Sequence, residues 1–221
     1  MLVTINGGRA VGEHDDNGQA TGTVSMIWPC AEPEGPDIVR IINAAAVAYR
    51  GVIPADRWHE PYMPSEELRA EITAGVRFTG YRSDDQLIGV MGIQNVRNVR
   101  LIRHAYVLPE WQGHGIGSKL IDHLRGSGGG PILIGTWAAA SWAIHFYERH
   151  GFKLVPHDVI GPLLQAYWNV PERQIETSVV LASPALSAEA ATRLISGASR
   201  GRHRSQGIVE KLVGLRPRLG R

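Results

Sequence analysis

The stretch "HAYVLPEWQGHGIGSKLI", residues 104–121, carries glycine at three alternate positions, and these glycines decide how the sequence is interpreted. The residues before them are typical of a β-strand, and the residues after them recur at helical spacing. Glycine is costly inside regular structure, so a cluster at a strand-to-helix junction usually has a backbone reason. Without Cβ atoms the chain can curl until successive amide N–H groups converge where the helix begins. This arrangement suits a diphosphate, because first-turn amides and the helix dipole both favour negative charge.

Three glycine-rich phosphate motifs can be compared with this stretch. A P-loop needs Ser or Thr directly after its lysine, and neither follows Lys119. The dinucleotide fingerprint starts at Gly113, but Ser118 occupies the place of its third small residue. The pattern Gln/Arg-x-x-Gly-x-Gly/Ala matches residues 112–117 in full. A plain strand-to-helix turn would need only one glycine, so we favour the phosphate-binding interpretation.

Outward from this stretch, the hydrophobic pattern predicts short strands and amphipathic helices. The predicted strands span residues 23–29, 76–83, 86–96, 99–108, 131–137, 152–156 and 176–182. The predicted helices span residues 36–50, 66–74, 116–124 and 139–150. Simple alternation along 99–108 places Arg103 and Val107 on one face, and His104 and Tyr106 on the other. The order of elements predicts an α/β (mixed α+β) domain, in which helices pack on a mixed sheet of six or seven strands.

Composition divides the chain into three parts. Residues 1–22, rich in Gly, Asn and Asp, are predicted to form a disordered leader, and residues 23–182 the folded domain. Residues 183–221 are predicted to form a basic, poorly ordered tail. From residue 193 onward the tail carries +7 of formal charge against a total of +2, which leaves −5 for the rest. No aromatic residue is interleaved there for base stacking, so we favour a solvated extension over a nucleic-acid-binding arm.

Bulk composition argues against several classes of protein. With 43% hydrophobic and 20% charged residues, the 221-residue chain is expected to bury one core. The single cysteine, Cys30, excludes an internal disulfide framework. No apolar run approaches the ~20 residues of a membrane-spanning helix, and the N-terminus lacks the apolar core of a signal peptide. One cysteine and nine scattered histidines give no metal-ligand spacing, so we expect no metal site. The lack of a signal peptide and of a membrane span leads us to expect a cytoplasmic location.

Two motifs together resemble the core of the GNAT superfamily of acyl-CoA-dependent N-acyltransferases. The first is the opening stretch of strand, proline turn, glycine loop and helix. The second is "ASWAIHFYERHGF", residues 140–152, where a helix ends in Phe-Tyr-x-x-x-Gly-Phe. The resemblance covers about residues 23–182. It implies a GNAT-like sheet that splays beside the strand before the loop, with helices on both faces, and acetyl-CoA as co-substrate.

The resemblance also implies where the co-substrate and the catalytic acid lie. The backbone at Val107 would pair with the pantetheine arm. The diphosphate would lie on the loop residues Gln112, Gly113, His114, Gly115, Ile116, Gly117 and Ser118. Tyr147 matches the family's general acid, and a phenol of pKa ~10 can protonate a leaving thiolate of pKa ~8.5. Two positions depart from the family pattern: Leu101 stands where many members carry Glu, and Ala140 where many carry Asn.

The base and the acceptor pocket have several candidates in the sequence. His104, on the strand, and Glu60, in a proline-rich loop, are two candidates for the base that deprotonates an amine. A packed core histidine is the competing interpretation of His104. We expect the acceptor between the loops 52–64 and 157–174, because loops commonly shape specificity. The candidate substrate contacts in these loops are Trp58, Tyr62 and Trp168.

The residues and the resemblance together predict an N-acetyltransferase that moves an acetyl group from acetyl-CoA to a primary amine. We expect direct transfer in a ternary complex, because Cys30 lies far in sequence from the glycine loop. The acceptor is expected to be a small molecule or a peptide, with no membrane partner, and the sequence leaves a homodimer open. The alternative function is a non-catalytic acyl-CoA-binding or sensing module, which the departures at Leu101 and Ala140 motivate.

Overall fold

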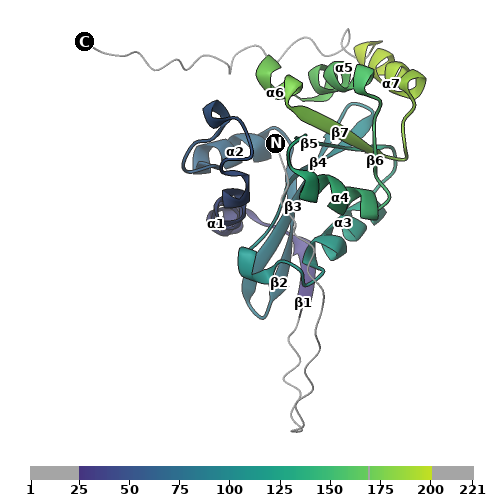
Figure 1. The fold of residues 1–221 in the computed structure, drawn as a ribbon. Coiled ribbons are helices and arrows are strands. Elements are labelled where there is room, and N and C mark those ends of the chain that lie inside the picture. The colour runs from purple at the N-terminus through teal and green to yellow at the C-terminus, as the bar shows by residue number, and fades with distance from the viewer. Residues whose placement is uncertain (1–24, 169, 201–221) are drawn as a thin grey trace.

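Residues 25–168 and 170–200, which the computed structural model describes, fold around a mixed β-sheet (Figure 1). The strand order is β1-β2-β3-β4-β5-β7-β6, and β4 and β5 are its parallel neighbours. The strands are β1 (Ser25–Pro29), β2 (Arg77–Ser83), β3 (Gln86–Val96), β4 (Val99–Val107), β5 (Ile132–Trp137), β6 (Lys153–Leu154) and β7 (Ser178–Ser183). The predicted mixed fold with six or seven strands is confirmed.

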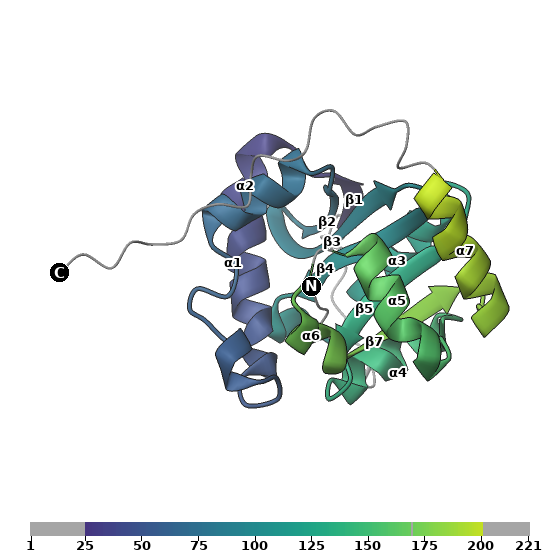
Figure 2. The ribbon, with the colours of Figure 1, turned by 90° about the horizontal axis from the view of Figure 1, so that it is seen from above.

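Helices cover both faces of this sheet (Figure 2). α1 (Gly35–Ala46) and α2 (Ser65–Thr73) lie on one side, and α3 (Ile116–Gly126) and α4 (Ser141–Arg149) on the other. α5 (His157–Tyr167), α6 (Glu172–Glu176) and α7 (Ala188–Arg200) lie toward the β7 end, where α5 packs against both β7 and α7. The predicted arrangement of helices on both faces is therefore also confirmed.

The helix α1 shows why the sequence forms these layers. Pro36 and Asp37 occupy its first turn, where a missing N–H and a negative charge are both favourable. The side chains that it buries recur at helical spacing and face β3 and β4; they are Ile38, Ile41, Ile42, Ala45 and Ala46. Burial of this stripe, at about 25 cal/mol per Å² of apolar surface, holds the helix on the sheet.

A β-bulge interrupts β4 beside its neighbour β3. Val90 of β3 pairs with Tyr106, whereas Gly92 pairs with Arg103, so β4 carries one extra residue between these pairs. His104 lies in this bulge with φ of +50°, in the left-handed region that side chains seldom adopt. Because of the extra residue, Arg103 and His104 both contact α2. The simple alternation predicted along 99–108 is therefore wrong at this point.

Beyond the bulge, β4 and β5 separate. The two strands pair only over Arg100–Ile102 and Ile132–Ile134, although both continue for several residues. The remaining part of β4 stays paired with β3 on its other edge. The sheet is thus split between β4 and β5 at the end where the glycine loop begins.

The chain after β6 differs from the predicted loop. Residues 157–174, expected to be a loop, contain α5 and the start of α6. The buried residues of α5 recur at helical spacing; they are Val159, Ile160, Leu163, Leu164 and Tyr167. Pro162 inside this helix and the prolines on either side obscure its pattern in the sequence.

A helix follows the domain boundary that the sequence predicts after residue 182. α7 lies within the segment that we predicted to be a poorly ordered tail, and its Ala191 is fully buried against the α5 side of the molecule. The hydroxyl of Tyr167 in α5 lies 2.8 Å from Asn98 Oδ1 and 3.0 Å from Leu194 O, either of which can accept its one proton. Residues 1–24 and 201–221, with the predicted leader and much of the predicted tail, lie outside the described residues.

Candidate functional site

The edge of β4 that faces the split carries an outward-pointing backbone at Val107. The N–H of Arg100 donates to Pro131 O on the β5 side, and the N–H of Leu108 donates to Ile88 O on the β3 side. In a regular strand these two amides, eight residues apart, would point the same way. The bulge at His104 reverses the alternation, so the N–H of Leu108 points toward β3. The N–H of the preceding residue, Val107, therefore points to the opposite side, into the split. The bulge thus presents main-chain groups at a sheet edge that another strand would otherwise cover.

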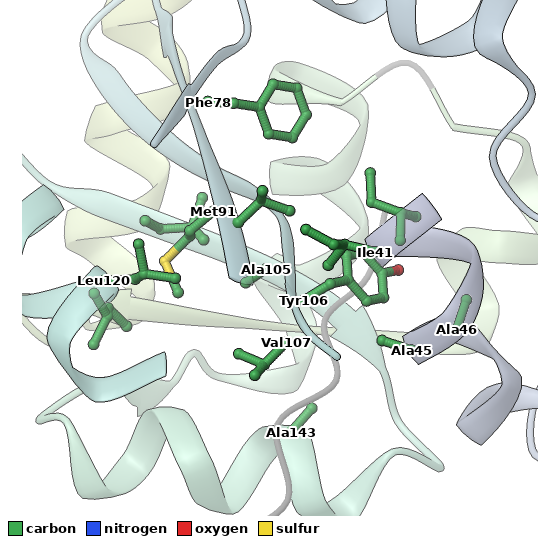
Figure 3. Packing of buried hydrophobic residues seen from close by; sticks show 14 of the residues in the cluster. Ile41, Ala45, Ala46, Phe78, Met91, Ala105, Tyr106, Val107, Leu120 and Ala143 are labelled. Carbon is green, nitrogen blue, oxygen red and sulfur yellow. The ribbon is translucent and has the colours of Figure 1, made fainter. Parts of the chain in front are cut away.

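The side chains of β4 diverge at the same place. Figure 3 shows Tyr106 directed toward Ile41 and Ala45 of α1, and Val107 directed toward Ala143 of α4. Tyr106 and Val107 are both almost completely buried. Beside the split, the side chains of Tyr106 and Val107 therefore leave β4 on opposite faces of the sheet.

The glycine loop ends at the first turn of α3, as the sequence predicts. Gly113 and Gly115 have φ of +86° and +73°, and Gly115 is the N-cap of α3 without a side-chain capping bond. The amides of Gly115, Ile116, Gly117 and Ser118 precede the first N–H that can bond within the helix. That first bond runs from Lys119 N to Gly115 O at 3.1 Å. The four amides can hold an anion at a positive helix end.

Two side chains tie the loop to its surroundings. Gln112 Nε2 donates to Val107 O at 3.0 Å, which fixes the loop to the open end of β4. His114 is exposed; its Nδ1 lies 3.1 Å from Gln112 O, and its ring lies 5.9 Å from the Trp111 ring. The predicted cofactor residues from Gln112 to Ser118 thus lie between the open end of β4 and the first turn of α3.

Tyr147 lies on α4, one turn after Ala143 that faces Val107. Its side chain is fully buried against Phe146 and Phe152, and its hydroxyl has no hydrogen-bond partner among the described residues. Burial raises the pKa of Tyr147 well above its ordinary value, so the phenol stays protonated. A buried hydroxyl without a partner is costly, and a bound molecule would remove that cost.

An aromatic cluster joins the loop after α1 to the helix α4. The Tyr62 ring is 5.5 Å from that of Trp58 and 6.3 Å from that of Tyr49, and the Tyr49 ring is 5.6 Å from that of Trp142. The hydroxyls of Tyr62 and Tyr106 share a hydrogen bond, and burial raises the pKa of Tyr62 to about 12. The loop after α1 and the helix α4 thus meet at this cluster.

The structure separates the predicted acceptor residues. Trp58 and Tyr62 belong to the aromatic cluster, whereas Trp168 lies in a second hydrophobic cluster with α5 and β7. A Cβ at Gly135 of β5 would lie 3.4 Å from the Trp168 ring, so the indole packs on the strand. Trp58 and Tyr62 are therefore brought together, and Trp168 is not with them.

The two candidate bases have different surroundings. Glu60 is 61% exposed, is paired with Arg50, and accepts a hydrogen bond from Trp58 Nε1 at 3.2 Å. His104 is fully buried, with its Nε2 3.3 Å from Glu71 Oε2 of α2. Burial lowers the pKa of His104 more than the neighbouring Glu71 raises it, so the ring is held neutral.

Glu71 forms the centre of a buried contact between α2 and β4. Its Oε1 accepts a hydrogen bond of 2.8 Å from Arg103, whose other nitrogen donates to Gln94 Oε1 at 2.9 Å. Burial alone would raise the pKa of Glu71, but the hydrogen bond with His104 and the charge of Arg103 bring it to about 2. Glu71 is therefore ionised and fully engaged.

Four residues that the structure places near the candidate site are not among the site residues predicted from the sequence; they are Glu67, Glu71, Tyr49 and Trp142. The spacing of Glu67 and Glu71 at i and i+4 puts both on one helix face, but exposed helices show the same spacing.

Within residues 25–168 and 170–200, no group of three or more His, Cys, Asp or Glu could hold a metal ion. In the same part of the chain, no helix is long and apolar enough to cross a membrane.

Comparison with protein families gives one match. Residues 74–154, from just before β2 to β6, match the model of the acetyltransferase (GNAT) domain. This match contains the glycine loop, the split and Tyr147, and it confirms the resemblance stated from the two motifs. No curated protein sequence matches the chain.

Several solved structures share the fold. The PaiA N-acetyltransferase from Thermoplasma acidophilum in complex with coenzyme A is 17% identical, with a TM-score of 0.53 over 72% of this chain and 98% of that one. A GNAT-family acetyltransferase from Staphylococcus aureus Mu50 is 16% identical, with a TM-score of 0.53 over 72% and 98%. The ribosomal-protein-S18-alanine N-acetyltransferase from Escherichia coli is 14% identical, with a TM-score of 0.51 over 72% and 92%.

Proposed function

The chain carries a domain of the GNAT acetyltransferase family, and from this premise we propose that it transfers an acetyl group from acetyl-CoA to a primary amine. The transfer is direct, in a ternary complex, and we assign it to the cytoplasm. One observation carries the proposal: the glycine loop and the outward backbone of Val107 adjoin the split in the sheet, and Ala143, one turn before the buried Tyr147, faces Val107 (Figure 3). The coenzyme A in the Thermoplasma structure supports the choice of co-substrate.

Each part of acetyl-CoA has a matching group in this proposal. The diphosphate binds the first-turn amides of α3 from Gly115 to Ser118. The pantetheine arm lies along the split and pairs with the backbone of Val107. The thioester then lies at the end of β4, with Tyr147 on one side and the aromatic cluster on the other. The amine approaches from the cluster side.

The proposed chemistry needs one acid and one base. The neutral amine nitrogen attacks the thioester carbonyl carbon, a C–N bond forms and the C–S bond breaks. The sulfur leaves as a thiolate and takes the proton of Tyr147, which solvent then replaces. The nitrogen loses one proton on the acceptor side. Burial raises the pKa of the Cys30 thiol to about 12, which supports direct transfer without a cysteine intermediate.

The first test is calorimetric titration of CoA and acetyl-CoA into wild type, Gly115→Glu and Gly115→Ala. Both variants put a Cβ at a left-handed position, which costs roughly 1–2 kcal/mol, and no atom lies within 4 Å of that Cβ. Only Glu adds a negative charge where the diphosphate should bind. We expect micromolar binding by wild type, similar binding by Gly115→Ala, and loss of roughly 100-fold in Gly115→Glu.

The outcomes separate the two candidate functions. No binding by wild type would withdraw the proposal, since the glycines would then serve only the turn. Binding together with thiol release in a panel of alkyl, arylalkyl, amino-acid and peptide amines would establish the enzyme. Binding without turnover of any amine would favour the acyl-CoA-binding module, which the buried Leu101 at the usual Glu position motivates.

A further inference from the structure

The proposed reaction leaves one role without a residue, namely the group that takes the proton of the amine. An amine is mostly protonated at neutral pH and must lose a proton before or during attack. The usual family position for a carboxylate holds Leu101, which is fully buried in the second hydrophobic cluster. The base must therefore come from another element on the acceptor side of the split.

The other titratable groups near β4 are already engaged. His104 is fully buried in the bulge and faces Glu71. Glu71 is held by Arg103 at 2.8 Å. Glu60 is exposed and paired with Arg50. Each of these three groups therefore already has a charged or polar partner among the described residues.

We propose that Glu67 of α2 is the residue that binds the protonated acceptor amine and accepts its proton. Glu67 lies one helical turn before Glu71, on the face of α2 that turns toward β4, and beside the buried Leu68. Its side chain is half-buried, and it makes no hydrogen bond or ion pair with the described residues. This inference rests on the proposed function and adds the residue that the function requires.

An electrostatic effect and a hydrogen bond link Glu67 to the end of β4 through Tyr62. Glu67 lies close enough to Tyr62 for its charge to raise the pKa of that phenol, after the larger effect of burial. The hydroxyl of Tyr62 shares a hydrogen bond with Tyr106 of β4, and the next residue is Val107, whose backbone faces the split. An amine between Glu67 and the end of β4 would thus lie against aromatic rings with a carboxylate at one end.

The charges that face Glu67 come from three elements. They are Glu71 on its own helix, Arg103 on β4 and His59 in the loop after α1. Burial raises the pKa of Glu67 first, and the negative charge of Glu71 raises it further, while His59 and Arg103 lower it by less. A carboxylate with a raised pKa is a better match for proton transfer near neutral pH than an ordinary one.

The proton balance of the step is simple. The ammonium N–H gives its proton to a carboxylate oxygen of Glu67, and the neutral nitrogen keeps the electron pair that attacks the thioester. Glu67 becomes a neutral carboxylic acid and gives this proton to solvent, and the second proton, which the nitrogen loses after the C–N bond has formed, then passes to the same carboxylate. Because its side chain is half-exposed, it can release the proton to solvent before the next turnover.

The test compares Glu67→Gln with Glu66→Gln as the matched control. Glu66 is the preceding residue on α2, is 79% exposed and pairs only with Arg69 among the described residues. We would measure kcat/KM against pH for the amine found in the panel, and the affinity for CoA by calorimetry. We expect Glu67→Gln to lower kcat/KM roughly 100-fold or more and to remove its acidic limb, with CoA affinity unchanged. Glu66→Gln should keep the wild-type rate and profile.

A second readout does not depend on turnover. In protein labelled with carbon-13 at the glutamate carboxyl, the signal lost in Glu67→Gln should titrate above the ordinary range of a glutamate, because burial and the charge of Glu71 raise its pKa. A wild-type rate or an intact acidic limb in Glu67→Gln, while wild type acetylates the amine, would overturn this inference and leave the proposed function standing. No turnover by wild type with any amine would overturn both.

Discussion

Tyr147 is the residue whose role can be tested with the least change to the packing of the core. Tyr147→Phe removes one oxygen that has no partner in the described structure and keeps the ring contacts with Phe146 and Phe152. We expect the free energy of unfolding to stay the same or rise, because an unsatisfied buried group costs about 1–3 kcal/mol. We expect kcat to fall roughly 100-fold if the phenol protonates the leaving thiolate.

Urea unfolding measures the free energy of unfolding, and initial rates of thiol release measure kcat. A large loss of stability would mean that the hydroxyl has a structural partner. An unchanged kcat with unchanged stability would remove Tyr147 from the proposed mechanism and leave the binding module as the better function.

At the scale of single residues, the sequence predicts those site residues that lie close together along the chain. The loop from Gln112 to Ser118 is contiguous, and Tyr147 lies in a short motif, so both could be found without the fold. Glu67 could not be found, because its importance depends on Tyr62, Arg103 and Glu71 meeting across three elements. His104 and Glu60 were plausible by residue type alone, and only the structure reveals that each already has a partner.

At the scale of elements, the contact between α2 and β4 predicts how stability depends on pH. The pKa of Glu71 is about 2 in the folded protein and about 4.5 in the unfolded chain. A carboxylate with a lowered pKa stabilises the fold above its unfolded value, and this contribution is lost as the pH falls toward the folded value. The shift corresponds to about 3 kcal/mol, and we regard this as its upper bound, since a neutral His104 contributes less.

Glu71→Gln is the variant that isolates this contribution. We expect it to be less stable than wild type at pH 6, by up to about 3 kcal/mol, with the difference shrinking between pH 4.5 and 2. Urea unfolding across that range measures the difference, and the exposed Glu66→Gln should show none of it. A difference that does not change with pH would mean that Glu71 acts by packing and not by charge.

The elements also show where pattern analysis works and where it stops. The strands and helices from β1 to α4 follow clear periods, and the structure has them within a few residues of their predicted bounds. The bulge in β4 leaves no mark in the alternation, since it depends on pairing with β3. The sequence predicts a loop where α5 lies, because Pro162 inside the helix is untypical of helical sequence.

At the scale of the whole molecule, α7 tests how far the domain extends. Ala191 is fully buried, and the neighbouring Thr192 is exposed on the same helix. We expect Ala191→Glu to lower the free energy of unfolding by roughly 2–4 kcal/mol, because a charge would be buried without a partner. Thr192→Glu, which adds the same charge at the surface, should change it by less than about 1 kcal/mol.

Urea unfolding of both variants decides the question. If Ala191→Glu is as stable as wild type, α7 is dispensable and the domain ends near residue 182, as the composition first indicated. If it is destabilised as expected, we propose that the domain includes at least residues 25–200. The sequence could not decide this, because the basic composition of the tail begins within the helix itself.

The single extra residue at His104 has a consequence for how this protein can change over time. A substitution in β4 alters one side chain, but a one-residue deletion at the bulge would turn every amide and side chain after it to the opposite side. Val107 would then point its backbone at β3, and Tyr106 and Val107 would exchange faces. We therefore expect descendants of this gene to tolerate replacements along the strand far more readily than any change in its length.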